Sequence, residues 1–376
     1  MSNDTEKAQN TDNPKSQDYQ KFFITQKKSD FQDDNQTITK EKEKQKQKSN
    51  LIFINYYVDL ITYALIIGVV YCSYLMLIGL DKHVDKLKSY NPDYPFPSVS
   101  SMLSAFYILI VLMVVHHFFK YLTVDRLEKF LSRNYSQEEI LIYKNKVSTN
   151  IIKLILYTFS TIFGYYALKD LSFFPWSLGG NGEYKSVFAK GYPDFLFFDK
   201  TNLFDFYYNF NLAFAIFDTY ILLTYPLQSD FLFMVLHHLV TFNLVVFSFL
   251  TNYSNIGCVV YFIHYSGDIL SQLVRICIHL NIPGIICCYL TMGFLAVFVY
   301  TRLFVFGDLI YHTFSSILYE DFSIYSRYLC CFLGVLMMLN IIWIFLISKK
   351  VLNFLLTGKV EEIYKLKKTE QSKKVI

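Results

Sequence analysis

Charged side chains are scarce in this 376-residue chain, where they make up 18% of the residues, against about 25% in an average soluble domain. Much of that charge lies in residues 1–50 and 349–376, so the middle of the chain holds even less. The net charge is only +4, whereas a protein that binds nucleic acid is expected to present a strongly basic face. The composition therefore argues against a nucleic-acid partner.

Cysteine patterns typical of zinc or redox sites are missing as well. The seven cysteines form no CxxC pair and no other zinc-like spacing. All of them fall in apolar stretches, so we interpret them as free thiols that pack as small hydrophobic side chains. Residues 1–50 contain no apolar segment that could be the core of a cleavable signal peptide. They are mostly Lys, Gln, Asp, Asn and Ser, which bury too little apolar surface to offset ordering entropy, and we predict a disordered tail.

Long apolar runs dominate the rest of the chain. Hydrophobic residues make up 53% of the sequence and aromatic residues 19%. A membrane-spanning helix needs ~20 mostly apolar residues, and continuous runs favour helices over the alternating strands of a barrel. We therefore predict an all-α polytopic membrane protein with about eight transmembrane helices, six or seven being the alternative because one connection is short. The expected spans lie near residues 56–80, 101–123, 149–168, 207–226, 231–251, 256–281, 284–306 and 324–348.

Basic residues are concentrated at the two ends of the chain and in one loop. An even number of spans puts both ends on one side, and the positive-inside rule assigns them and the loop at 124–148 to the cytosol. The long aromatic loop at 169–206 has less basic charge for its length and is expected in the lumen. We accordingly predict a cytosolic tail at 1–50, two N-terminal transmembrane helices within 51–124 and a basic cytosolic tail at 351–376.

The last four residues read KKVI. Lysines at the third and fourth positions from the C-terminus resemble the dilysine retrieval signal of endoplasmic-reticulum membrane proteins, which requires a cytosolic tail. A chance pair in a lysine-rich tail is the alternative. On the first interpretation this is a multi-pass protein of the endoplasmic-reticulum membrane.

Two adjacent histidines, His237 and His238, interrupt one of the apolar runs. On a helix of about 100° per residue, three further polar positions fall within about 60° of His237. These positions are Thr241, Ser248 and Asn252. His238 lies about 100° from His237, at the edge of this polar face. The run therefore predicts a helix with one narrow polar face.

A second polar face is expected on the following run. Measured from His264, Asp268 falls at about 40° and Arg275 at about 20° on the same helix. Ser271 and Gln272 lie on or near this face. A histidine and an aspartate four residues apart are neighbours on a helix surface, so the spacing places an imidazole beside a carboxylate.

An ionisable side chain at the membrane centre costs about 2.5–3.5 kcal/mol on insertion scales. Two successive helices that both align such residues most simply line a shared interior cavity, and we predict a functional site there. A purely structural polar network between the helices is the alternative. Asp218, inside another apolar run, could join the cavity. We interpret the second histidine pair, His116–His117, as interfacial because no polar stripe continues from it.

Residues 230–275 resemble the signature of ceramide synthases, the longevity-assurance branch of the TLC-domain family. The signature reads roughly HHxxT, then Ser, Asn and Gly, then a histidine with an aspartate four residues on. The stretch YTRLFVF at 300–306 resembles a later TRLxxF segment of the family, and the whole resemblance covers about residues 140–350. The signature positions are occupied without a gap by His237, His238, Thr241, Ser248, Asn252, Gly257, His264 and Asp268.

Some positions depart from the family pattern. Tyr265 stands where the family has an aspartate after the third histidine, Gln272 replaces a glutamate, and Arg275 replaces the usual lysine. The loss of one carboxylate leaves Asp268 to do any charge work alone.

The resemblance implies a TLC-domain helical bundle around an intramembrane cavity at 140–350. It also implies an N-acyltransferase of ceramide biosynthesis, which moves a fatty acyl group from acyl-CoA to the amine of a sphingoid base. The partners would be the lipid bilayer and these two substrates. No cofactor or metal is expected, because a thioester is already activated and acyl-CoA is a co-substrate. The oligomeric state is left open, with a homo-oligomer among the alternatives.

The chemistry suggests roles for the predicted site. His237 or His238 would act as a general base, or as a nucleophile that carries a transient acyl-imidazole. Asp268 would orient His264 or one of the pair, as carboxylates do in catalytic triads. The remaining polar residues would support the substrate, with the guanidinium near the CoA phosphates: Thr241, Ser248, Asn252 and Arg275.

Two other functions stay open at this point. Membrane di-iron enzymes use several histidine boxes such as HxxHH. This chain has isolated pairs of adjacent histidines and no HxxHH motif. A non-catalytic TLC-domain protein that binds or transports a lipid in the endoplasmic reticulum would need the cavity without the chemistry.

Overall fold

The computed structural model describes residues 57–132, 135–184, 188, 190–224, 230–319 and 323–357. The tail predicted at 1–50 and most of the tail predicted at 351–376 lie outside the described residues. The chain divides into two compact units, residues 1–61 and 62–376. Only residues 57–61 of the first unit are described, and the account below concerns the second.

Helices account for nearly all of the described chain, and the prediction of an all-α membrane protein is confirmed. Every apolar run predicted as a span coincides with a helix, although the first helix continues to Tyr90 and the run at 284–306 continues to Tyr319. The loop predicted at 124–148 is mostly helical, because the second helix continues to Leu131 and the third begins at Gln137. The helices are Tyr57–Tyr90, α2 (Leu103–Leu131), α3 (Gln137–Leu168), α5 (Asn202–Thr224), α6 (Phe231–Leu250), α7 (Ser254–His279), α8 (Gly284–Val299), α9 (Phe306–Tyr319) and α10 (Ile324–Thr357). A π-helical segment, η4 (Tyr300–Val305), joins α8 to α9 without a break.

Six helical stretches of the described residues are long and apolar enough to cross a membrane. They are Tyr57–Tyr90, Val99–Leu131, Ile142–Leu168, Phe231–Leu250, Gly284–Ser316 and Ile324–Thr357. The helices α5 and α7 are 23 and 26 residues long but are not among the six. Both are mostly buried against other helices, with α7 packed on α3, α5, α6 and α8. A helix shielded from lipid in this way can carry polar side chains at lower cost.

Local sequence signals mark several helix ends. Ser136 and Glu139 form a capping box that opens α3, which satisfies backbone N–H groups that have no partner within the helix. Pro283 precedes α8, in line with the tolerance of helix starts for proline. Asn281 just before it has a positive φ of 54°, a conformation that asparagine tolerates better than most residues. The chain therefore turns sharply between α7 and α8.

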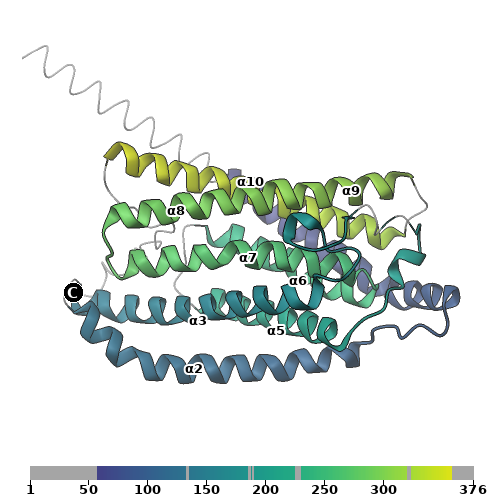
Figure 1. Ribbon diagram of the computed structural model, residues 1–376, viewed down its shortest axis with the longest axis horizontal. Coiled ribbons are helices and arrows are strands. Elements are labelled where there is room, and N and C mark those ends of the chain that lie inside the picture. Colours follow the sequence, from purple (N-terminus) through teal and green to yellow (C-terminus); the bar gives the residue numbers. More distant parts are fainter. Residues whose placement is uncertain are drawn as a thin grey trace, which may run out of the picture. The chain divides into compact units, whose positions relative to one another are not determined.

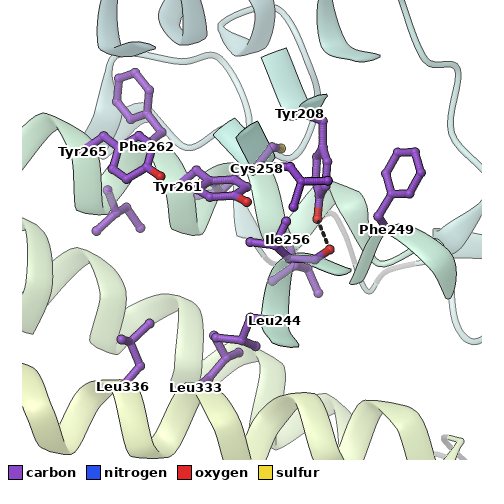
Figure 2. Packing of buried hydrophobic residues seen from close by; sticks show 14 of the residues in the cluster. Tyr208, Leu244, Phe249, Ile256, Cys258, Tyr261, Phe262, Tyr265, Leu333 and Leu336 are labelled. Carbon is purple, nitrogen blue, oxygen red and sulfur yellow. Dashed lines mark hydrogen bonds between the residues drawn. The ribbon is translucent and has the colours of Figure 1, made fainter. Parts of the chain in front are cut away.

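The helices α5, α6, α7 and α10 pack around one interior space. Helix α3 lies beside α2 and α7, while α10 lies beside α6, α8 and α9 (Figure 1). Gly257 allows α7 to approach α5 and α6 closely. A Cβ atom at this position would lie 2.8 Å from the Ser248 hydroxyl of α6 and 2.9 Å from the Tyr208 hydroxyl of α5. Figure 2 shows Tyr261 and Tyr265 of α7 facing Leu333 and Leu336 of α10 across a gap.

Candidate active site

A pocket of about 960 Å³, counting its open mouth, lies between α5, α6, α7 and α10. Most of its lining is apolar, including the tyrosine and leucine side chains that face each other in Figure 2. Six of the eight predicted site residues line this pocket: His237, His238, Thr241, Ser248, His264 and Asp268. The two polar faces expected from helical periodicity therefore meet in one cavity.

The histidine pair of α6 is held by neighbours from two other helices. The ring of His237 packs against Trp343 of α10, with ring centroids 5.1 Å apart. The Nδ1 atom of His238 lies 3.1 Å from the hydroxyl of Thr219 on α5. Thr241, one turn along α6, has a buried hydroxyl without a hydrogen-bond partner among the described residues. The pair is thus ordered by packing and leaves hydrogen-bonding capacity inside the cavity.

His264 enters the cavity from α7. Its Nδ1 atom lies 2.8 Å from the backbone carbonyl of Val260, one turn earlier on the same helix. Its ring packs edge-on against Phe306, with centroids 5.0 Å apart. The buried Nε2 atom has no hydrogen-bond partner in the part of the chain that is described. This ring therefore offers one free nitrogen to the interior.

Asp268 does not orient an imidazole, which corrects the expectation from sequence. Its carboxylate pairs with the guanidinium of Arg302 at 2.7 Å, and it makes no hydrogen bond to a histidine in the described residues. Arg302 also donates to the His264 carbonyl at 2.9 Å, so it ties two points of α7 to η4. A guanidinium is the stronger partner because a charge-assisted hydrogen bond to a carboxylate is about twice as strong as a neutral one.

Arg302 was not among the predicted site residues, although it is only 3% exposed. It sits in η4, and π-helical turns often occur at functional sites. Its guanidinium also lies 3.4 Å from the Asn340 side-chain oxygen and over the ring of Phe298. The sequence could have predicted this residue, because placing an arginine inside a membrane-spanning apolar run costs as much free energy as placing a histidine there.

A second ion pair also contributes to the lining of the site. Asp218 of α5, which was expected as a possible member of the cavity, lines the pocket and pairs with Lys153 of α3. The Tyr157 hydroxyl also donates to this carboxylate at 3.2 Å. Lys153 was missed, although it stands alone in the apolar run IIKLILY. A lone lysine in such a run predicts a carboxylate partner on a neighbouring helix.

A second, more polar pocket of about 560 Å³ continues from the first. Three basic side chains and two carboxylates line it, with one cation more than the acids can pair: Lys153, Arg275 and Arg302 beside Asp218 and Asp268. The two pockets share five residues, namely Tyr157, Asp218, His237, His238 and Asp268. Arg275, predicted as a supporting residue, therefore lies on the polar side. The histidine pair stands at the junction between an apolar hollow and a basic one.

Asn252 lies outside both pockets, which corrects its predicted place on the polar face of α6. The helix ends at Leu250, and Asn252 has a positive φ of 65° in the turn that follows. Its side chain binds the Leu196 carbonyl and the Lys200 ammonium, both at 2.5 Å. Burial lowers the pKa of Lys200 to about 8. Asn252 therefore anchors the preceding loop and does not line the cavity.

Among the described residues, no group of three or more His, Cys, Asp or Glu side chains is arranged to hold a metal ion. The acidic side chains nearest the histidines are each engaged by a cation: Asp218 by Lys153 and Asp268 by Arg302. What the arrangement offers instead is a set of imidazole nitrogens beside a long apolar space. This is the chemistry of proton transfer and nucleophilic attack near a hydrophobic substrate.

Comparisons with known proteins point to the same region. The TLC domain family model matches residues 146–349. Human ceramide synthase 5 is 32% identical over 140 residues, which are 36% of this chain and 35% of that protein. Ceramide synthase 4 of Bos taurus is 33% identical over 149 residues, covering 38% and 37% of the two chains. Human ceramide synthase 4 is 30% identical over 139 residues, covering 36% and 34%. The chain thus aligns with about a third of the length of the curated relatives it matches.

Proposed function

The chain belongs to the TLC-domain family, and from that premise we propose that it is a ceramide synthase-like N-acyltransferase. It would transfer a fatty acyl group from acyl-CoA to the amine of a sphingoid base. The observation that carries this proposal is the position of His237 and His238, where an apolar pocket meets a basic one. A long-chain acyl-CoA has the matching form, since an apolar chain and a phosphate-bearing head flank its reactive thioester.

The apolar pocket has the extent that a long acyl chain needs. It reaches from His237 past Ser248 to Tyr253 and Ile256, beyond the far end of α6. At 1.5 Å per residue, the helix from His237 to Leu250 is about 20 Å long. We assign the acyl chain to this space, with its carbonyl carbon beside the histidine pair.

The basic pocket suits the head of acyl-CoA. Arg275 lines it and could meet phosphate oxygens. It extends toward the C-terminal end of α7, where His279 packs against Tyr143 at the start of α3. Tyr143 lies within residues 124–148, the basic segment that the charge distribution assigns to the cytosol. This orientation would let acyl-CoA enter from the cytosolic side of the endoplasmic-reticulum membrane, with both termini cytosolic.

The reaction needs a base and an oxyanion donor. An imidazole takes a proton from the ammonium or amine of the sphingoid base, the nitrogen attacks the thioester carbonyl, and the C–S bond breaks as CoA leaves with a proton. If His237 or His238 is the nucleophile, its imidazole nitrogen first attacks the thioester carbonyl and forms a C–N bond as the C–S bond breaks and CoA leaves with a proton. The amine then attacks the acyl-imidazole and displaces the imidazole. Two buried donors without partners in the described residues, the Thr241 hydroxyl and the Trp343 indole N–H, could bind the oxyanion. A thioester is already activated, so the mechanism requires no metal or other cofactor.

The test is formation of ceramide by membranes that contain the protein. Given a long-chain acyl-CoA and sphinganine, they should form N-acylsphinganine, measured by mass spectrometry, above the level of membranes without the protein. A free fatty acid in place of acyl-CoA should give no product, and a metal chelator should leave the rate unchanged. If acyl-CoA binds but no product forms, the protein would instead be a TLC-domain lipid-binding or transport protein.

A further inference from the structure

The hydroxyl of Thr219 makes two contacts but carries only one hydrogen. It donates that hydrogen to the Ala215 carbonyl, one turn earlier on α5, at 2.8 Å. A carbonyl oxygen can only accept, and threonine commonly donates to this carbonyl within a helix. Toward the Nδ1 atom of His238, at 3.1 Å, the hydroxyl oxygen is therefore left as an acceptor. The hydrogen in that second contact has to come from the imidazole.

This contact fixes the tautomer of His238. A neutral imidazole that donates from Nδ1 carries a lone pair on Nε2. We propose that Thr219 is a positioning residue that holds His238 as the Nδ1–H tautomer, with Nε2 as the proton acceptor for acyl transfer. The assignment of a catalytic role to Nε2 rests on the proposed function, whereas the tautomer itself follows from the contacts of Thr219.

The other candidate partner for the Nδ1–H group is already engaged. Asp218 precedes Thr219 on α5, and its carboxylate accepts from Lys153 and Tyr157. It makes no hydrogen bond to His238 within the described residues, yet both side chains line the same pocket. The Asp218 carboxylate can stabilise the imidazolium that forms during the reaction. Thr219 determines which ring nitrogen carries the proton in the neutral imidazole.

The three histidines of the cavity differ in what determines their tautomers. His264 donates from Nδ1 to the Val260 carbonyl, an acceptor that no side-chain substitution removes. The Nδ1 atom of His237 has no hydrogen-bond partner in the described residues. Only His238 depends on another side chain for its tautomer. A change at Thr219 should therefore alter one of the three rings and leave the other two as they are.

The proton path follows from this assignment. The amine of the sphingoid base gives a proton to Nε2 of His238 as the new C–N bond forms, and the ring becomes an imidazolium with Nδ1–H still on Thr219. When the C–S bond breaks, the imidazolium returns a proton to the leaving thiolate, so the ring ends in its starting state.

Three variants test the role in turnover. Thr219→Val keeps the shape but removes the acceptor, and we expect kcat to fall about 10-fold with KM unchanged, part of the ~10²–10⁴-fold that a general base supplies. Thr219→Ser restores the oxygen and should restore kcat. Thr224→Val is the matched control, because within the described residues the Thr224 hydroxyl on the same helix binds only backbone carbonyls of its own turn, and it should behave as the unaltered protein. A Thr219→Val enzyme with normal kcat would overturn the proposed role.

A spectroscopic measurement tests the tautomer without any activity. In detergent-solubilised protein labelled with ¹⁵N-histidine, the ¹⁵N shifts distinguish Nδ1–H from Nε2–H rings, and His238→Gln identifies the signals of His238. We expect the Nδ1–H pattern for His238, and its loss in Thr219→Val. An Nε2–H pattern would refute the proposal even if ceramide is formed. The Nδ1–H pattern in a protein that forms no ceramide would refute the acyltransferase function and leave the assigned tautomer standing.

Discussion

Replacing both His237 and His238 with alanine should lower the rate of N-acylation about 10²–10⁴-fold, the usual contribution of a positioned general base or nucleophile. The two rings stand where the apolar and basic pockets join, and His237 packs against both His238 and Trp343. The same substitution removes no ion pair, so the helices should assemble as before. The rate is measured as N-acylsphinganine formed per unit of folded protein.

The other histidine pair provides the control for this substitution. His116 was interpreted as interfacial, but it is 2% exposed and packs against Phe217 of α5, with ring centroids 5.4 Å apart. It lines neither pocket. His116→Ala should therefore keep the turnover per folded molecule. Equal losses in the two variants would mean that the histidines of α6 act through packing alone, against the catalytic assignment.

Replacing Arg302 with methionine should destabilise the protein by up to about 3–5 kcal/mol, the cost of breaking a buried pair, because the carboxylate of Asp268, which is 24% exposed, loses its partner. The guanidinium also holds the His264 carbonyl and contacts Asn340, so α7 and α10 both lose a contact to η4. We expect a large fall in the thermal unfolding temperature of the purified protein in detergent. The double variant R302M/D268N should recover much of that loss, since it removes both charges.

A surface ion pair gives the scale for comparison. Lys144 and Glu128 are 2.7 Å apart, but the Glu128 side chain is 44% exposed. Exposed pairs of this kind contribute about 0–1 kcal/mol, so Lys144→Met should shift the unfolding temperature little. If Arg302→Met is as mild as Lys144→Met, the Arg302–Asp268 pair does not hold the bundle together.

Most of the fold could be predicted from the sequence, because a membrane-spanning helix requires ~20 consecutive, mostly apolar residues. The polar faces were readable for a related reason, since helical periodicity alone places His237, Thr241 and Ser248 on one side of α6. Periodicity failed at Asn252 because the helix ends two residues earlier, and such ends depend on local turn geometry and not on composition. The error moved one residue from the cavity to a loop contact.

Local sequence could not predict which cation pairs with each carboxylate of the site. Asp268 looked like a partner for His264, its neighbour one turn away, yet its carboxylate binds Arg302 from another helix. Asp218 is likewise bound by residues of α3, with Tyr157 lying 61 positions away in the sequence. Which cation meets which carboxylate depends on how the helices pack. The tautomer of His238 is hidden in the same way, because it depends on the approach of Thr219 from α5.

The central claim is that the hollow between α6, α7 and α10 receives an acyl chain beside the histidine pair. Photo-crosslinking with an acyl-CoA that carries a diazirine at the end of its chain tests it directly, with adducts mapped by mass spectrometry of the digested protein. We expect adducts at the far end of the pocket, on Tyr253, Ile256 or Cys330, and their suppression by excess unlabelled acyl-CoA. Adducts confined to outward-facing side chains, such as Tyr289 and Phe345, would contradict the claim.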